Sequence, residues 1–240
     1  MTTLQDTAVG PASQDEPRAP IAILSPAKRN ALVACFNAGG LHKKDGSWHG
    51  LPGGKPVSGM TTADLDTIAE DAIRGEGAIP SFKGYRGFPA CICTSINSEI
   101  VHGIPSKDAV IRDGDVISID CGAIVDGYHG DAAITVPVGE VTPDKLELLR
   151  VTEESLWHGM AAARLGGRLI DISRAIEAYI RSQPHPAGGT WGIVEEYVGH
   201  GIGTAMHQDP QVHNFVPPRA PKGPEIVKGL ALAVEPRELG

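Results

Sequence analysis

The chain has 240 residues, of which 41% are hydrophobic and 21% are charged, and its formal net charge at pH 7 is -8. This composition is typical of a soluble globular protein with one large domain or two small ones. The acidic balance argues against a nucleic-acid backbone or an anionic membrane as a direct partner.

The cysteines indicate a reducing compartment. Four are present, at Cys35, Cys91, Cys93 and Cys121. The two-residue step from Cys91 to Cys93 matches neither the zinc-binding nor the redox C-x-x-C pattern. The sequence also shows no secretory leader and no long apolar run. We therefore expect free thiols, a cytoplasmic location and no membrane partner.

The first quarter of the chain predicts little regular structure. Residues 1–20 are rich in Pro, Ser, Gln and Asp and poor in large apolar side chains, which is typical of a disordered tail. Residues 37–60 are rich in Gly and Pro and predict loops. We expect the folded domain to occupy residues 61–240.

Three helices follow from apolar spacing and from start and stop signals. The first begins at Thr61 or Thr62, whose hydroxyl suits a helix cap, and ends near Gly75. The second opens at Thr142–Asp144, because proline suits the first helical position and an acid favours the positive end of the helix dipole. The third opens at Asp171.

Five segments read as strands because their β-branched and apolar residues are bounded by turn formers. They are Cys91–Ile96, Asp115–Val125, Tyr128–Val138, Val194–Val198 and Ile226–Val234. Helices and strands mix in this order, but helices do not alternate singly with strands. The pattern predicts an α+β fold with an antiparallel sheet.

One tripeptide occurs twice, as His102–Ile104 and as His200–Ile202. Both copies follow a helix and a strand-like segment. Chance could produce a match this short, but the shared context favours a duplicated half-domain. Two such halves would face each other and bring His102 and His200 towards one central cleft.

A hairpin is predicted around Asp126-Gly127, a strong two-residue turn signal. If no bulge intervenes, Asp120 lies opposite Ala133, and Asp131 shares its face as a diagonal neighbour. Such neighbours are separated by roughly 7 Å between Cβ atoms, which suits two carboxylates that converge on metal ions. The alternative is that both acids lie on an open, solvated face.

A third acid, Glu235, ends the predicted strand before Pro236. A glutamate at a strand end is usually a solvent-exposed charge at the edge of the sheet. Together with Asp120, Asp131 and His200, Glu235 forms an oxygen-rich ligand set, unlike a cysteine-based structural zinc site. Nucleophilic and nucleotide-binding alternatives are weak, since the chain lacks G-x-S-x-G, Walker A, G-x-G-x-x-G and HExxH.

At these residues the chain resembles the type I methionine aminopeptidases. The similarity runs from about Met60 to about Pro236 and rests on GYRGFPACICTSINSEIVHGIP, DGDVISIDCGAIVDGYHGD, GHGIGTAMHQDPQV and LAVEP. It implies a pita-bread fold, in which two pseudo-symmetric α+β halves enclose a centre of two divalent metal ions. The implied activity is hydrolytic removal of the initiator methionine from peptides and nascent proteins.

The resemblance also implies roles for single residues. The metal ligands would be Asp120, Asp131, His200 and Glu235. Catalysis and substrate contact would involve His102 and His207, with Glu235 as the proton relay. The methionine side-chain pocket would be lined by Tyr85, Phe88, Cys93 and Met206. The ions could be Co, Mn, Fe, Zn or Ni, and the partner would be a nascent-chain N-terminus at the ribosome, bound by a monomer.

Two departures from the family pattern lead to further expectations. The family continues past the EP pair with a second bridging glutamate and closing strands, whereas this chain stops at Gly240 and has Arg237 where methionine is usual. Residues 21–60 do not preserve the family's amphipathic first helix. We therefore expect a C-terminally truncated and N-terminally altered member, with a weakened second metal site and reduced turnover.

Two alternatives remain at this point. A non-catalytic fragment or pseudoenzyme could keep the fold and bind nascent chains. A proline-specific peptidase of the same fold is the weaker alternative, because such relatives usually carry a large amino-terminal domain and only about sixty residues precede the match here.

Overall fold

The computed structural model describes residues 42–44, 47–49, 58–219 and 221–239. The expected disordered tail, residues 1–20, lies outside the described residues, as does most of the segment 21–60. Within that segment, β1 (His42–Lys44) pairs with β2 (Ser47–His49). No helix in the described part of the chain is long and apolar enough to cross a membrane.

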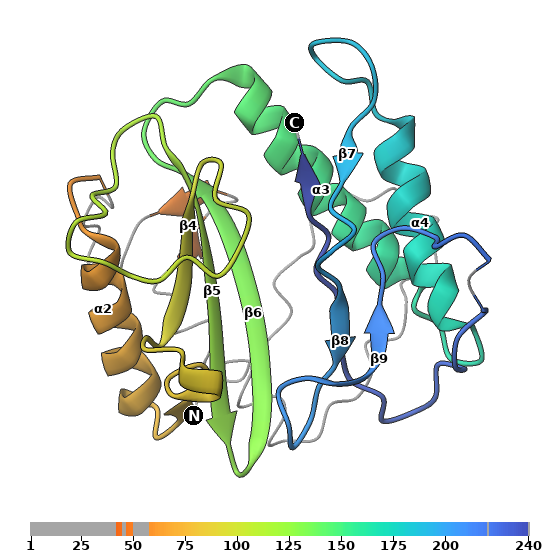
Figure 1. Ribbon diagram of the computed structural model, residues 1–240, viewed down its shortest axis with the longest axis horizontal. Coiled ribbons are helices and arrows are strands. Elements are labelled where there is room, and N and C mark those ends of the chain that lie inside the picture. Colours follow the sequence, from red (N-terminus) through yellow and green to blue (C-terminus); the bar gives the residue numbers. More distant parts are fainter. Residues whose placement is uncertain (1–41, 45–46, 50–57, 220, 240) are drawn as a thin grey trace.

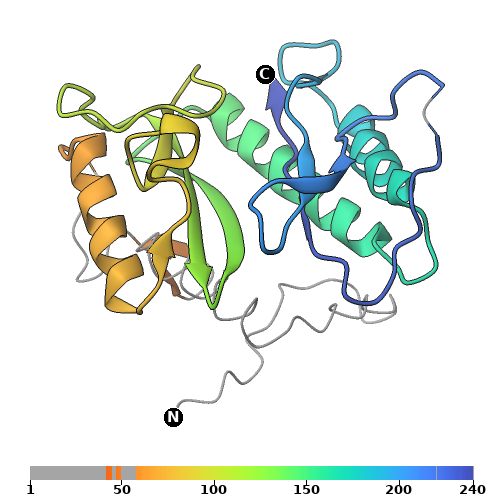
Figure 2. The same cartoon turned by 60° about the horizontal axis from the view of Figure 1, so that its bottom comes forward.

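The described chain forms two lobes (Figure 1). The first lobe comprises α2 (Thr62–Gly75), β3 (Ile79–Pro80), the short 3-10 helix η1 (Tyr85–Gly87), β4 (Ile92–Ile96), β5 (Val116–Val125) and β6 (Tyr128–Pro137). The second lobe comprises α3 (Pro143–Ala162), α4 (Leu169–Ser182), β7 (Gly192–Ile193), β8 (Gly199–Gly201), β9 (Gln208–Val212), β10 (Leu232–Ala233) and β11 (Glu238–Leu239). Figure 2 shows the lobes from a second direction, with α2 and α4 at opposite outer edges.

The first lobe is a four-stranded antiparallel sheet covered by α2. Strand β5 pairs along one edge with β3 and β4, which follow each other end to end, and along its other edge with β6. Thr61 caps α2, and the Asp64 carboxylate accepts a hydrogen bond from the Thr61 N–H (2.8 Å), which confirms the predicted start. The buried helix face, Leu65, Ala69 and Ile73, packs on apolar residues of the sheet, so one core joins helix and strands.

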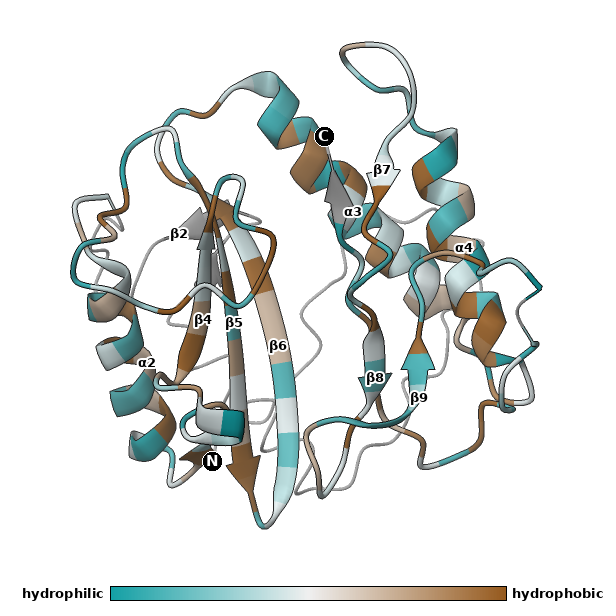
Figure 3. Cartoon of the chain, in the orientation of Figure 1, coloured by the Kyte–Doolittle hydropathy of each residue, from teal (hydrophilic) through white to brown (hydrophobic). Residues whose placement is uncertain are grey.

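The β5–β6 hairpin has the predicted register. Its ladder runs from Val125 opposite Tyr128 to Val116 opposite Pro137 with no shift, so Asp120 lies opposite Ala133. Asp126 and Gly127 adopt positive φ angles of 51° and 78°, as a two-residue type I′ turn requires. Figure 3 shows that β6 is hydrophilic in the half near this turn and hydrophobic in its other half.

The second lobe packs two helices against short strands. The order β10-β8-β9 places β8 in the centre of a three-stranded sheet, and β11 pairs with β7. At Gly159 of α3, an added Cβ would lie 2.7 Å from Ile176 Cγ1 of α4, so the glycine allows the helices to approach closely. The core beneath them includes Val151, Ile172 and Trp191, all fully buried.

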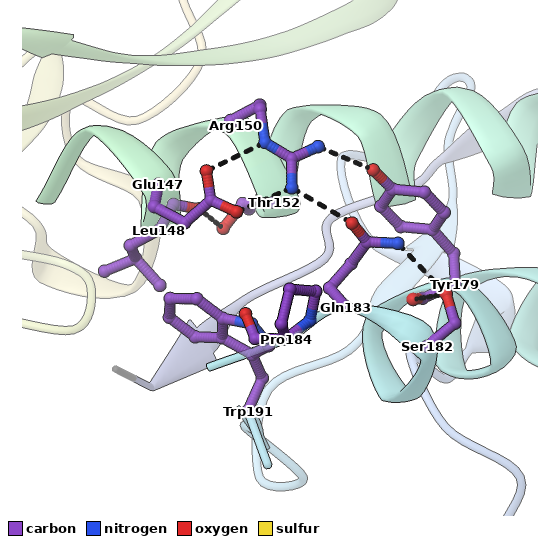
Figure 4. A network of polar contacts seen from close by, with 9 residues as sticks. All are labelled: Glu147, Leu148, Arg150, Thr152, Tyr179, Ser182, Gln183, Pro184 and Trp191. Atoms are coloured by element: carbon purple, nitrogen blue, oxygen red, sulfur yellow. Dashed lines mark hydrogen bonds and ion pairs between the residues drawn. The ribbon is translucent and has the colours of Figure 1, made fainter. Parts of the chain in front are cut away.

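Polar contacts also join the two helices (Figure 4). The Arg150 guanidinium of α3 contacts Glu147 (2.7 Å) and donates to Tyr179 Oη (3.0 Å) and Gln183 Oε1 (3.0 Å) at the end of α4. Trp191 lies nearby and donates its indole N–H to the Pro184 carbonyl (3.1 Å). One guanidinium thus bridges the two helices at this end of the lobe.

Three predicted boundaries are wrong. Helix α4 begins at Leu169 rather than at Asp171, because the Asp171 carboxylate reaches back to accept from the Arg168 N–H (2.8 Å). Residues 194–198 form no strand; three consecutive residues there, 195–197, are exposed, and pairing occurs on either side in β7 and β8. The strand expected at 226–234 shortens to β10, because a turn at Lys228–Gly229, where Gly229 has φ +93°, interrupts it.

An exposed ion pair connects α2 to the loop before η1. The Glu70 carboxylate contacts Lys83 Nζ (2.6 Å) and Arg74 (2.8 Å). Hydrogen bonds from Lys83 and then Arg74 lower the pKa of Glu70 from 4.5 to about 2. Because the folded-state pKa is the lower one, this pair stabilises the fold above pH 4.5, and its contribution is lost as the pH falls from 4.5 through 2.

We therefore expect carbon-detected NMR to give a titration midpoint near 2 for the Glu70 carboxylate. The midpoint should rise towards the ordinary value of 4.5 in Lys83→Met and at high salt, since the pair is exposed to solvent. A wild-type midpoint near 4.5 would show that the pair does not form in solution.

Candidate metal centre

Three ligand-type side chains from different strands meet between the lobes. Asp131 lies on β6, His200 on β8 and Glu235 just after β10, and one ligand atom from each lies within 4.8 Å of the others. His200 Nε2 lies 3.4 Å from Asp131 Oδ2 and 3.2 Å from Glu235 Oε1. The first lobe supplies one acid of this group and the second lobe supplies the other two residues.

Glycines make room for His200 within its sheet. An added Cβ at Gly199 would lie 2.2 Å from the Ala233 carbonyl oxygen of β10, and one at Gly201 would lie 2.4 Å from the Asp209 carbonyl oxygen of β9. Both obstacles are backbone atoms, which cannot turn away as a flexible side chain can. His200 Nδ1 lies 2.9 Å from the Gly201 carbonyl oxygen, which orients the ring so that Nε2 faces the two acids.

The charges of these groups depend on one another. Burial disfavours the charged imidazolium, but hydrogen bonds to Asp131 and Glu235 outweigh burial and raise the pKa of His200 to about 10. For Glu235, burial acts to raise the pKa, yet the hydrogen bond from His200 and the charge of Arg237 hold it below its ordinary value. Without a metal, the positive charge of protonated His200 thus offsets the negative charges of Asp131 and Glu235.

The fourth predicted ligand, Asp120, lies on β5 beside this group. Its Cα partner is Ala133, two residues from Asp131 on the neighbouring strand, so the two acids share a face as the register predicts. Asp120 Oδ1 is buried and has no hydrogen-bond partner among the described residues. Burial, followed by the charges of Asp131 and Glu235, raises the pKa of Asp120 well above its ordinary value.

These residues fit a divalent cation. Carboxylate oxygens and one imidazole nitrogen are suitable ligands for divalent first-row metals. The close approach of Asp131, His200 and Glu235 provides one ligand set. The buried, unpartnered oxygen of Asp120 adds an acceptor that a cation would satisfy, because an unpaired buried polar atom is costly.

Two more predicted histidines border the same space. A cavity of about 210 Å³ is lined by His102, His200, His207, Glu235 and Arg237, among others. The rings of His200 and His207 are 4.3 Å apart, and His102 lies edge-on to Tyr197 at 5.7 Å. The repeated tripeptide does bring His102 and His200 to one cleft, although His102 lies in a loop and His200 in a strand.

The residues predicted for the methionine pocket also lie together. Cys93 and Met206 are buried in one apolar cluster, and Tyr85 and Phe88 pack against it. Burial, followed by the charges of Asp120 and Asp131, raises the pKa of the Cys93 thiol to about 12, so the thiol stays neutral and acts as an apolar wall. The Tyr85 hydroxyl lies 2.9 Å from His207 Nδ1, which connects this cluster to the acids and His200.

Comparison with known proteins identifies the family. The profile of Metallopeptidase family M24 matches residues 34–239. This chain is a member of metallopeptidase family M24. Its membership implies divalent metal binding and agrees with the presence of a ligand-type cluster between the lobes.

Named M24 relatives resemble the chain closely. It is 53% identical to methionine aminopeptidase of Clostridium acetobutylicum over 178 residues, which cover 74% of this chain and 68% of the relative. It is 51% identical to methionine aminopeptidase 1 of Bacillus subtilis, with the same coverage.

Solved structures of M24 proteins show the same fold. The crystal structure of methionine aminopeptidase from Thermotoga maritima matches with a TM-score of 0.73 and 32% identity, over 91% of this chain and 82% of that chain. Prolidase from Pyrococcus furiosus matches with a TM-score of 0.62 at 18% identity, over 88% of this chain and 53% of that chain, and this likeness shows the fold alone. The predicted α+β pita-bread fold is confirmed.

Three residues of this M24 centre were not predicted from the sequence. Phe82 is buried in the pocket cluster and packs edge-on against Phe88, with the ring centroids 6.4 Å apart. Asn214 is fully buried and donates from Nδ2 to the Glu235 carbonyl (2.7 Å). Arg237 contacts the Glu235 carboxylate. Two of them had a signal in the sequence: Phe82 is one of two phenylalanines beside Tyr85, and Arg237 stands where the family usually has methionine.

Proposed function

We propose that this M24 member is a methionyl aminopeptidase, which hydrolyses the bond after an N-terminal methionine in peptides and nascent proteins. One observation carries the proposal: an apolar cluster of aromatic and sulfur-containing side chains lies next to the candidate metal ligands, joined to them through Tyr85 and His207. An unbranched thioether packs well on such walls. The names of the relatives at about 50% identity support the same activity.

We further propose that Asp120, Asp131, His200 and Glu235 hold two divalent cations, drawn from Co, Mn, Fe, Zn or Ni, with the second held more weakly. Asp131 would serve both ions. Such cations supply Lewis-acid polarisation of a carbonyl and activation of water. Cytoplasmic location, a monomeric state and encounter with nascent chains at the ribosome belong to this proposal and rest on the resemblance to methionine aminopeptidases.

His207 is positioned to stabilise negative charge on the reacting carbonyl oxygen. Burial and the neighbouring charge of His200 lower its pKa, so its imidazole is neutral at pH 7. When the Tyr85 hydroxyl donates to Nδ1 at 2.9 Å, the remaining ring proton is on Nε2. That N–H can donate to an oxyanion, which is where such donors are most effective.

Proton transfer falls to Glu235, and contact with the substrate backbone falls to His102. The Glu235 carboxylate is ionised because its pKa lies below the ordinary value despite burial, so it can accept a proton from water and pass it to the leaving amine. His102 lines the same cavity as His207, and burial, followed by the charge of Arg237, keeps its pKa low. A neutral His102 can hydrogen-bond a peptide backbone there.

A peptide panel tests the substrate. We expect the 240-residue chain, supplied with Mn²⁺ or Co²⁺, to cleave Met-Ala-Ser at least about 10-fold faster than Leu-Ala-Ser, since apolar pockets discriminate by one or two groups to roughly this extent. His200→Ala provides the blank. Equal rates for the Met and Leu peptides would contradict the pocket assignment.

A non-catalytic, nascent-chain-binding relative is the second candidate function, and one observation favours it. Arg237 forms an ion pair with Glu235 (2.7 Å) within the proposed catalytic cavity. If the wild-type rate on Met-Ala-Ser equals that of the His200→Ala blank while Met-peptide binding persists, this second function replaces the first.

A further inference from the structure

The side chain of Arg237 enters the candidate metal centre. Its Nη2 lies 2.7 Å from Glu235 Oε2, and both side chains are largely buried, at 20% and 23% exposure. Glu235 Oε1 lies 3.2 Å from His200 Nε2. One oxygen of this carboxylate therefore faces the Arg237 guanidinium, and the other faces His200 Nε2.

The guanidinium acts on the whole centre. It lines the cavity together with His102 and His207, and its charge acts on Asp120 as well as on Glu235. Its Nε is buried and has no hydrogen-bond partner among the described residues. An arginine required only to hold the chain in place would be expected to use its donors more fully.

The backbone holds this segment independently of the guanidinium. The Arg237 carbonyl accepts a hydrogen bond from the Val194 N–H (3.0 Å), next to the β7–β11 pairing. The carbonyl of Glu235 is held by Asn214 (2.7 Å). The side chain of Arg237 is therefore free to have another role, namely to supply positive charge to the cluster of acids.

We propose that Arg237 is a built-in competitor of divalent cations: its guanidinium occupies Glu235 Oε2, the oxygen that does not face His200, so that a second cation binds fully only when Arg237 leaves this oxygen. This inference rests on the metal centre of the proposed function. Guanidinium and a divalent ion both neutralise carboxylates, but they cannot use the same buried oxygen at once. The competition gives a physical reason for a weak second site.

Calorimetric titration of the metal-free chain with Mn²⁺ tests the competition. Wild type should show one tight and one weak site. In Arg237→Met, which keeps an unbranched side chain without charge, the weak site should tighten by roughly 10-fold or more, since a hydrogen bond between charged groups has about this effect. Arg237→Lys, which keeps the charge without the planar fork, should lie between the two.

The matched control is Arg74→Met. Arg74 also pairs with a glutamate at 2.8 Å, but on the exposed face of α2, so its loss should leave Mn²⁺ binding unchanged. Unchanged or weaker Mn²⁺ binding in Arg237→Met would overturn the inference, as would two equally tight sites in wild type.

Thermal unfolding separates competition from a purely structural role. Without metal, Arg237→Met should be less stable than wild type, because three buried acids lose a counter-charge. With saturating Mn²⁺ the upward shift in Tm should be larger in the variant than in wild type. A structural role predicts a loss of the same size in both conditions, which would overturn the inference.

These measurements do not depend on peptide hydrolysis. If Arg237→Met gains Mn²⁺ affinity but neither it nor wild type cleaves Met-Ala-Ser faster than the His200→Ala blank, the competition stands and the proposed aminopeptidase function fails. If wild type cleaves the peptide but Arg237→Met shows no gain in Mn²⁺ affinity, the aminopeptidase function stands and the competition fails.

Discussion

Replacing His200 by alanine is expected to abolish tight Mn²⁺ binding and to lower Met-Ala-Ser hydrolysis by on the order of 100-fold or more, because even residues that only orient a ligand contribute 10- to 100-fold. His200 is the proposed nitrogen ligand of the cluster and touches both Asp131 and Glu235. Its loss also leaves two largely buried acids without their imidazolium, so the metal-free variant should lose about 3 kcal/mol of unfolding free energy. Calorimetry, peptide assay and urea denaturation measure the three effects.

His158→Ala is the control for this variant. His158 stacks on Tyr179 at 4.3 Å, is exposed on α3 and lies outside the cavity. Its loss should affect neither metal binding nor hydrolysis. If His200→Ala kept wild-type Mn²⁺ affinity, the metal centre would have to be sought elsewhere in the chain.

Gly201→Ala should be a strongly damaging single-methyl change in the second lobe. The new Cβ would lie 2.4 Å from the Asp209 carbonyl oxygen and 2.8 Å from its carbon, both backbone atoms of β9. The pairing of β8 with β9 would have to open, and His200 would move with it. We expect a loss of about 3 kcal/mol in unfolding free energy, at the upper end of what overpacking causes, together with weaker Mn²⁺ binding.

A second glycine tests whether the effect is steric. At Gly75, the last residue of α2, an added Cβ meets nothing within 4 Å, and the backbone does not have a positive φ angle. Gly75→Ala should therefore leave stability unchanged or raise it by a few tenths of a kcal/mol, since alanine restricts the unfolded chain. If urea denaturation gave the same midpoint for Gly201→Ala and Gly75→Ala, the close approach of β8 and β9 would be refuted.

The acids of the first lobe could be predicted because local chemistry determines their placement. A two-residue turn at Asp126-Gly127 sets the register of the β5–β6 hairpin, and the register alone decides that Asp120 and Asp131 share a face. The start of α2 could also be predicted from local sequence, since Thr61 and Asp64 cap the helix within one turn. Such features need no knowledge of distant parts of the chain.

Two of the misses arose where long-range packing decides the structure. Residues 194–198 carry β-branched ends, yet they form no strand, because a strand also requires a partner at the right distance. The contact of Arg237 with Glu235 was missed for a related reason. No local pattern shows whether an arginine four residues after β10 points to solvent or into a cavity, and only the folded arrangement of both lobes decides it.

The division of the ligands between lobes makes the centre conditional on their docking. Asp120 and Asp131 come from the first lobe and His200 and Glu235 from the second, and a backbone hydrogen bond from the His129 N–H to the Gly203 carbonyl (2.8 Å) joins the lobes beside them. Neither lobe alone contains a complete ligand set. An ion bound by these proposed ligands would therefore act as a cross-link between halves that are distant in sequence, and its binding energy would contribute directly to the cooperativity with which they fold as one unit.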